Sequence, residues 1–215
     1  MTLTHRVRDA DGVAQGAIVL MHGRGADEND LFPLFDILDP HRRLVGLAPR
    51  GPLALGPGGA HWYVVRELGY PDPSTFWPTF NAATSWLDDT LSKLQIATDR
   101  TIVGGFSQGA VMSYSLALGN DRPRPAGLMP LSGFIPTVEG LDIARSDLDG
   151  FPVAIGHGTF DPVITVDWSR RAAEQLSQAG ADVLFRESPM QHTIDPAFLS
   201  ELRSWVDRVL VSQAS

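Results

Sequence analysis

Short apolar segments alternate with stretches of helical periodicity along most of this chain. The apolar segments predict short strands buried in a sheet. The predicted strands are Ala17–Met21, Arg43–Leu47, Arg100–Gly104, Gly127–Leu131, Pro152–Gly156 and Asp182–Arg186. Because strands separated by helices are typical of a mainly parallel sheet, we predict an α/β fold with a mainly parallel central sheet and helices on both faces.

Apolar residues recur every three or four positions between strands, as expected for the buried face of a helix. One such series consists of Phe80, Ala83, Leu87, Thr90 and Leu94, and another of Phe198, Leu202, Trp205, Val206 and Val209. A third series consists of Trp168, Ala172 and Leu176. We expect that third helix to end at Gly180, and Asp195-Pro196 predicts an N-cap followed by proline at the first helical position.

A first strand is expected near Leu3–Arg8, ahead of the dipeptide Asp11-Gly12. This dipeptide favours a tight turn, so we predict a β-hairpin at the start of the chain. We find no internal repeat, low-complexity tract or domain linker in the sequence. Residues 1–215 are therefore interpreted as a single domain.

Residues 51–80 differ from the rest because breaker and aromatic residues are concentrated there. Pro57-Gly58-Gly59 predicts a loop, and the aromatic residues are Trp62, Tyr63, Tyr70, Phe76, Trp77 and Phe80. Long loops in compact domains are usually functional or disordered, and the aromatic content argues against disorder. Two interpretations stay open: a loop folded on its own aromatic mini-core, or a wall or cap over an apolar substrate pocket.

Composition narrows the functional classes. The net charge of −8 argues against a nucleic-acid partner, which would require a basic face. The absence of cysteine excludes disulfides and a thiol nucleophile. The sequence has neither a secretory leader nor an apolar run of about 18 residues, so we expect a cytoplasmic protein without stable membrane insertion. Export by a route without such a signal stays open.

The segment Gly105-Phe106-Ser107-Gln108-Gly109 directly follows the predicted strand Arg100–Gly104. A strand that ends at G-x-S-x-G and passes into a helix is typical of a nucleophile elbow, in which a sharp turn exposes the serine hydroxyl. The small residues two positions before and two after the serine allow the backbone to make that turn. Ser107 is therefore the candidate nucleophile.

A serine hydroxyl requires a base, and the base requires an acid that orients it. On this fold class the order along the chain is Ser, then Asp or Glu, then His. His192 is the histidine that lies beyond the later strands, on the loop before the last helix. Asp161 lies in the loop after the strand Pro152–Gly156, which makes it the candidate acid. The competing acids are less suitable, since Asp167 falls in a helix, Asp182 opens a strand and Asp195 is the predicted cap.

An oxyanion hole requires two backbone N–H groups. Gln108 supplies one as the residue after the nucleophile, and Arg24 supplies the other from the turn after Ala17–Met21. His22 and His157 each precede a glycine at a strand end, and we interpret both as bracing their turns. The histidines lack the i, i+4 spacing of a metal site, and Gly56–Gly59 lacks the Lys-Ser/Thr of a phosphate loop.

Together these residues resemble the phospholipase/carboxylesterase family of α/β hydrolases, which includes bacterial carboxylesterases and acyl-protein thioesterases. The resemblance spans nearly the whole chain, through Val19–Gly25, Gly104–Gly109, His157–Val163 and Met190–His192. It implies an α/β-hydrolase fold, a triad of Ser107, Asp161 and His192, and oxyanion donors at Arg24 and Gln108. It also implies a substrate-binding role for Trp62, no cofactor, no metal, and a homodimer as in several members.

The chain departs from the family pattern at three positions. Ala110 replaces a common glycine, which should tighten helix packing slightly, and Gln191 stands before the base where glycine is common. Arg24 places a cation beside the oxyanion hole, where it could favour carboxylate-bearing or smaller esters, point to solvent, or pair with Asp27 or Glu28.

We expect a serine carboxylesterase that hydrolyses small-molecule carboxylic esters through an acyl-enzyme. A thioesterase or lysophospholipase would use the same triad and differ in pocket length. Acyl transfer to an acceptor other than water, and a catalytically silent binding protein of the same fold, are the remaining alternatives.

Overall fold

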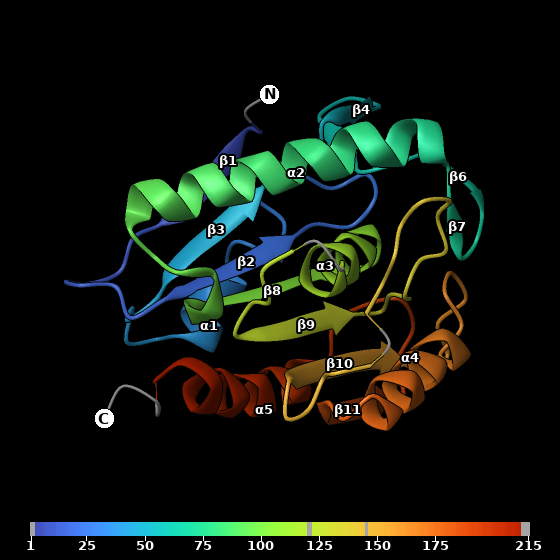
Figure 1. Cartoon of the computed structure of the whole chain (residues 1–215). Coiled ribbons are helices and arrows are strands. Elements are labelled where there is room, and N and C mark those ends of the chain that lie inside the picture. The colour runs from blue at the N-terminus through green and yellow to red at the C-terminus, as the bar shows by residue number, and fades with distance from the viewer. Residues whose placement is uncertain (1–2, 120–121, 145, 212–215) are drawn as a thin grey trace.

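The structure is a computed structural model that describes residues 3–119, 122–144 and 146–211. In this part of the chain, seven strands form one sheet in the order β1-β3-β2-β8-β9-β10-β11 (Figure 1). The strands are β1 His5–Arg8, β2 Ala17–Met21, β3 Val45–Pro49, β8 Thr101–Phe106, β9 Gly127–Leu131, β10 Pro152–Gly158 and β11 Asp182–Ser188. Only the edge strand β1 runs antiparallel to its neighbour, so the sheet is mainly parallel as predicted.

Helices cover both faces of the sheet because successive strand residues point to opposite sides. In β2, Val19 and Met21 belong to the core under α2 and α3, whereas Ile18 and Leu20 belong to the core under α1 and α5. Helix α4 packs with β10 and β11 on the same side as α3. The helices are α1 Leu34–Leu38, α2 Pro73–Leu94, α3 Gln108–Leu118, α4 Asp167–Gln178 and α5 Pro196–Val206, with a 3₁₀ turn Thr98–Arg100 and a π-helical turn Asp207–Val211. The architecture is that of an α/β hydrolase.

The predicted hairpin at the start of the chain is wrong. Strand β1 pairs with β3 instead of turning back onto β2. Arg8 is the physical reason: its guanidinium is buried and donates to the Asp39 carboxylate at 2.9 Å and to the Leu44 carbonyl at 2.8 Å. The Asp11 amide donates to the Arg42 carbonyl, so the segment after β1 follows the α1–β3 connection.

The aromatic-rich region 51–80 is more ordered than a loop. It holds two short hairpins, formed by β4 Leu53–Leu55 with β5 Gly59–His61 and by β6 Val65–Glu67 with β7 Tyr70–Pro71. Helix α2 also begins inside the region, because Asp72 caps the Ser74 amide and Pro73 occupies the first helical position. Trp62, Tyr63 and Phe76 are buried in the same core as β2 and α3, so no separate mini-core exists in this region.

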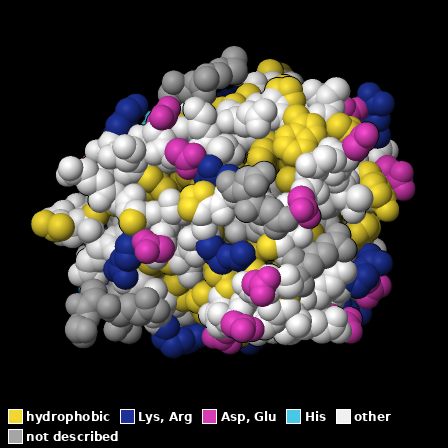
Figure 2. Space-filling view, in the orientation of Figure 1, with side chains coloured by type: hydrophobic (Ala, Val, Ile, Leu, Met, Phe, Trp, Pro, Cys, Tyr) yellow, Lys and Arg dark blue, Asp and Glu magenta, His cyan; other side chains and the backbone are white. Residues whose placement is uncertain are grey.

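The surface carries charges of both signs. Figure 2 shows acidic and basic side chains interspersed on one face, with hydrophobic side chains over the amino-terminal half of α2.

Among the described residues, no helix is both long and apolar enough to span a bilayer.

Candidate active site

Ser107 stands at the turn between β8 and α3, as the sequence predicts. Its φ of 55° and ψ of −118° are unusual for a residue with a side chain, and such conformations cost about 1–3 kcal/mol. The turn is held by the Ser107 amide, which donates to the Leu131 carbonyl at 2.9 Å. The strain therefore persists because the ends of β8 and β9 fix the backbone on both sides.

The two flanking glycines of the elbow are sites of close backbone approach. A Cβ at Gly105 would lie 2.6 Å from the Met21 carbonyl oxygen, and one at Gly109 would collide with that same oxygen. The first turn of α3 thus rests directly on the end of β2. The methyl group of Ala110 finds room because Gly133 faces it, and a Cβ at Gly133 would lie 2.5 Å from that methyl carbon.

The structure brings Ser107, His192 and Asp161 together from three separate segments. His192 Nε2 lies 2.9 Å from Ser107 Oγ, and His192 Nδ1 lies 2.6 Å from Asp161 Oδ2. Ser107 is 8% exposed, so the residue is largely shielded from solvent. The imidazole also packs on the Phe106 ring, with ring centroids 4.7 Å apart. This arrangement allows proton transfer from the hydroxyl to the imidazole.

The Asp161 carboxylate is buried and heavily hydrogen-bonded. Its Oδ1 accepts from the Val163 and Ile164 amides at 2.8 and 2.9 Å, and its Oδ2 faces His192. Burial alone would raise its pKa, but the hydrogen bonds from His192 and the two amides outweigh burial and hold the pKa below its ordinary value. Asp161 is therefore ionised at neutral pH and accepts a hydrogen bond from His192 Nδ1–H.

The loop that carries His192 lies tightly against the end of β10. A Cβ at Gly158 would collide with the Met190 and Gln191 carbonyl oxygens. The Phe160 amide donates to the Met190 carbonyl at 3.0 Å, and the Thr193 amide donates to the Gln191 carbonyl at 2.9 Å. Gln191 is accommodated because its backbone makes these contacts while its side chain is exposed.

The two predicted oxyanion donors lie on either side of the elbow. Gln108 begins α3 directly after the serine, and Gly23, which precedes Arg24, approaches so closely that its Cβ would be 3.5 Å from Ser107 Cβ. Among the described residues, neither the Arg24 nor the Gln108 backbone amide donates to a protein acceptor. Both N–H groups are thus available to a ligand.

The Arg24 side chain is exposed and does not pair with the neighbouring acids. Instead, Arg50 Nη1 lies 3.0 Å from the Glu28 carboxylate and 3.7 Å from the Asp27 carboxylate. The interpretation that Arg24 pairs with Asp27 or Glu28 is therefore wrong, because a different arginine occupies both carboxylates.

Trp62 lies behind the candidate site. The indole is fully buried, and its Nε1 donates to the His22 carbonyl at 2.8 Å. Gln108 supports the same segment with its side chain, since Oε1 accepts from the Trp62 amide at 3.1 Å and Nε2 donates to the Tyr63 carbonyl at 2.9 Å. The motif did not reveal this second role of Gln108. A substrate-binding role for Trp62 stays a prediction, and its observed contacts support the turn that carries Arg24.

His22 and His157 are both buried at strand ends and hydrogen-bonded on both ring nitrogens. His157 Nε2 lies 2.7 Å from the Ile164 carbonyl and 3.2 Å from Asp161 Oδ2, so it braces the turn that carries the acid. Burial lowers the pKa of both histidines. Both are therefore neutral at neutral pH.

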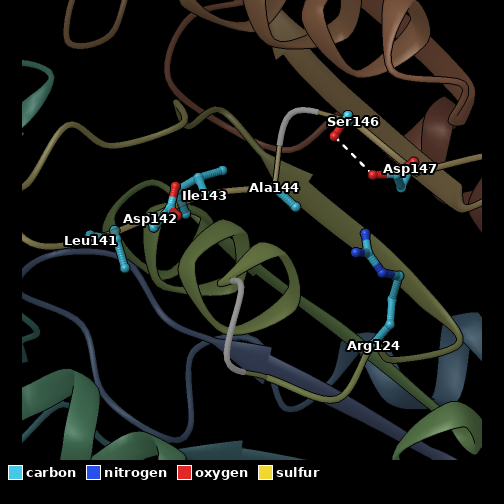
Figure 3. A pocket seen from close by; sticks show the side chains of 7 residues that line it. All are labelled: Arg124, Leu141, Asp142, Ile143, Ala144, Ser146 and Asp147. Atoms are coloured by element: carbon cyan, nitrogen blue, oxygen red, sulfur yellow. Dashed lines mark hydrogen bonds between the residues drawn. The ribbon is translucent and has the colours of Figure 1, made fainter.

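Two further features lie outside this cluster. Among the described residues, no group of three or more His, Cys, Asp or Glu side chains is arranged to hold a metal ion. A cavity of about 540 Å³ lies near the amino ends of β9 and β10, where Figure 3 shows Arg124 below Ser146 and Asp147. None of the candidate site residues lines this cavity.

The sheet order and the strand–serine–helix turn define the class of the protein as an α/β hydrolase. More specifically, the chain belongs to the phospholipase/carboxylesterase family, whose model matches residues 4–210. Acyl-protein thioesterase 1 of Candida albicans is 30% identical over 186 residues, which cover 78% of this chain and 79% of that protein.

Solved structures agree with this assignment. The crystal structure of esterase PE8 has a TM-score of 0.83 at 26% identity and covers 98% of this chain and 100% of that chain. A Bacillus cereus carboxylesterase has the same TM-score at 22% identity, covering 96% of this chain and 94% of its own, which supports the fold alone.

Proposed function

We propose that this chain is a serine carboxylesterase that hydrolyses small carboxylic esters through an acyl-enzyme on Ser107. The observation that carries the proposal is the position of His192, whose two ring nitrogens contact Ser107 Oγ and Asp161 Oδ2 at 2.9 and 2.6 Å. Because ionised Asp161 accepts from Nδ1, the free lone pair of the imidazole is on Nε2 and faces the hydroxyl. This is the tautomer that a general base requires.

In the proposed reaction, Ser107 Oγ attacks the ester carbonyl while its proton moves to His192 Nε2. The Arg24 and Gln108 amides donate to the oxyanion, a contribution of about 3 kcal/mol per donor. The tetrahedral intermediate expels the alcohol, which takes the proton from His192. A water molecule then attacks the acyl-enzyme by the same route, releases the acid and restores Ser107.

The substitution Ser107→Ala tests the proposal. It removes the nucleophile, so kcat for short p-nitrophenyl esters should fall about 10⁴-fold or more. Ser113→Ala is the matched control, because this buried serine lies in α3, the helix that follows Ser107, and its hydroxyl donates to the Ala110 carbonyl at 2.7 Å. Unchanged turnover in Ser107→Ala would refute the proposal.

A thioesterase is the second candidate, and its support is the 30% identity to a protein named acyl-protein thioesterase 1. Both reactions would use the same three side chains. The ratio of kcat/KM for butyrate, octanoate and palmitate esters to that for the matching thioesters distinguishes them. A thioester preference at every chain length would replace the carboxylesterase proposal with this one.

A further inference from the structure

His22 lies directly beneath the turn that carries the Arg24 amide. It is the first residue after β2 and is 1% exposed. Its Nε2 lies 2.9 Å from the Gly51 amide, and its Nδ1 lies 2.7 Å from the Gly23 carbonyl oxygen. The proposed reaction uses neither nitrogen directly.

These two contacts determine which nitrogen of His22 carries the proton. The Gly51 amide can only donate, so Nε2 must be the acceptor and Nδ1 must carry the hydrogen. Nδ1–H therefore donates to the Gly23 carbonyl. A charged imidazole would place a second hydrogen on Nε2, opposite the Gly51 N–H, and would break that contact.

The Gly23 carbonyl and the Arg24 N–H belong to the same peptide group. Because that group is planar and trans, its C=O and N–H point in opposite directions, and fixing one fixes the other. A hydrogen bond to the carbonyl also polarises the peptide and strengthens its N–H as a donor. His22 thus determines both the direction and the strength of the Arg24 donor.

Other contacts hold the flanking peptides of this turn. The Gly25 amide donates to the Ala60 carbonyl at 2.8 Å, and Trp62 Nε1 donates to the His22 carbonyl at 2.8 Å. The Gly23 carbonyl itself also accepts from the Ala26 amide, at a longer 3.3 Å. The His22 contact is thus the shorter of the two hydrogen bonds to this carbonyl.

We propose that His22 is a positioning residue whose neutral imidazole aims the Arg24 N–H at the oxyanion of the reacting ester. This inference rests on the proposed function, and it gives a histidine outside the triad an effect on the chemical step. Burial supports the neutral form because it is the largest influence on the pKa of His22 and lowers it. The hydrogen bond to the Gly23 carbonyl and the charges of Asp30 and Asp27 oppose this effect, and the charge of Arg50 adds to it.

The test compares His22→Asn with His22→Gln. An asparagine amide occupies the place of Nδ1 and can donate to the Gly23 carbonyl, whereas a glutamine amide reaches toward Gly51 and leaves that carbonyl without this donor. We expect kcat in His22→Gln to fall about 10- to 100-fold with little change in KM, less than the roughly 10²- to 10³-fold loss when an oxyanion donor is removed. His22→Asn should recover most of this loss.

A thionoester substrate distinguishes a misplaced Arg24 N–H from a general loss of active-site structure. Sulfur is a weaker hydrogen-bond acceptor than oxygen, so an intact oxyanion hole favours the C=O ester over the C=S ester. This preference should shrink in His22→Gln and persist in His61→Leu, a control whose imidazole contacts the Tyr63 carbonyl at 3.1 Å. Fluorophosphonate titration of Ser107 gives the concentration of folded sites in each variant.

Equal kcat values in His22→Gln and His22→Asn, or an unchanged preference for the oxygen ester in His22→Gln, would overturn the inference. ¹⁵N NMR of the unmutated protein offers a second measurement, and a hydrogen on Nε2 of His22 would also overturn it. If Ser107→Ala is inactive while His22→Gln behaves normally, only this inference fails. If Ser107→Ala stays active, the proposed function fails first.

Discussion

The Asp161 carboxylate has two oxygens with different tasks. Oδ1 accepts from two backbone amides, at Val163 and Ile164, which can only donate. Oδ2 lies within hydrogen-bond distance of His192 Nδ1 and 3.2 Å from His157 Nε2. The two amides therefore fix the rotation of the side chain and leave one oxygen to orient the proposed base.

This asymmetry predicts the effect of Asp161→Asn. The asparagine oxygen must take the place of Oδ1, since two N–H donors face it, so the NH₂ group faces His192 Nδ1. His192 would then carry its hydrogen on Nε2, where it cannot accept the Ser107 proton. We expect kcat to fall about 10⁴-fold, as when this tautomer is lost in other triads.

Steady-state kinetics and urea unfolding of Asp161→Asn check this prediction together. Asp167→Asn is the control, because Asp167 is an exposed acid at the start of α4 whose partner is Arg170. A kcat for Asp161→Asn within tenfold of the unmutated value would contradict the proposed orienting role.

The central strands could be predicted from the sequence because their apolar runs report local burial. Ala17–Met21 and Gly127–Leu131 match β2 and β9 in full, while β10 and β11 extend two residues further than predicted. The pairing of β1 could not be predicted, since it depends on the Arg8 guanidinium meeting Asp39, 31 residues away. A short turn signal carries no information about such a distant contact.

In the candidate site, too, the sequence indicated some features, whereas others depend on distant contacts. The order of Ser107, Asp161 and His192 along the chain indicated side chains that lie within hydrogen-bond distance in the structure. The sequence indicated that His22 braces its turn, but it did not reveal the contacts of the Gln108 side chain or the Gly51 partner of His22, because these depend on residues 51–63 folding back over β2 and α3. Motifs indicate reactive groups, whereas the partners that hold them in place appear only in three dimensions.

The Arg8–Asp39 contact predicts how β1 and α1 are held to the sheet. Arg8 and Asp39 side chains are 3% and 0% exposed, so Asp39→Ala removes the buried counter-charge of the guanidinium and leaves it the exposed Asp36 carboxylate, 3.2 Å from Nη1. Removing one partner of a buried ion pair costs about 3–5 kcal/mol. We expect the free energy of unfolding in urea to fall by this amount, with activity per folded molecule retained.

Glu187→Ala is the matched control for Asp39→Ala. Arg170 and Glu187 also form an ion pair, at 2.7 Å, but their side chains are 50% and 29% exposed. Solvent screens such pairs, so the cost should be about 1 kcal/mol or less. Similar losses in the two variants would show that burial does not determine the contribution of these pairs.

At the scale of the whole molecule, the candidate site lies where the carboxyl ends of β2, β8 and β10 converge. Ser107 follows β8, the Arg24 turn follows β2, and Asp161 follows β10. Two of these segments have a buried neutral histidine beside them, since His22 braces the turn that carries Arg24 and His157 braces the turn that carries Asp161. The stability of the fold and the geometry of the site therefore depend on the same two histidines.

That dependence predicts a loss of stability in mild acid. Burial lowers the pKa of His22 and His157 from the ordinary value of 6.5, so in the unfolded chain both histidines protonate at higher pH than in the folded protein. Their contribution is present above about pH 6.5 and is lost as the pH falls toward their folded-state values. Each histidine protonated only in the unfolded state contributes a slope of about 1.4 kcal/mol per pH unit.

Urea unfolding between pH 7.5 and about 5 measures this slope before most carboxylates titrate. Asp30, whose pKa burial raises, acts in the opposite direction because the folded protein holds its proton more tightly. Asp161, whose pKa is lowered, adds a further loss only as the pH falls below the ordinary aspartate value of 3.8. The variant His157→Gln removes one titrating group, so its slope should be smaller by up to one proton. A flat profile, or an equal slope in the variant, would mean that these histidines are not held neutral by the fold.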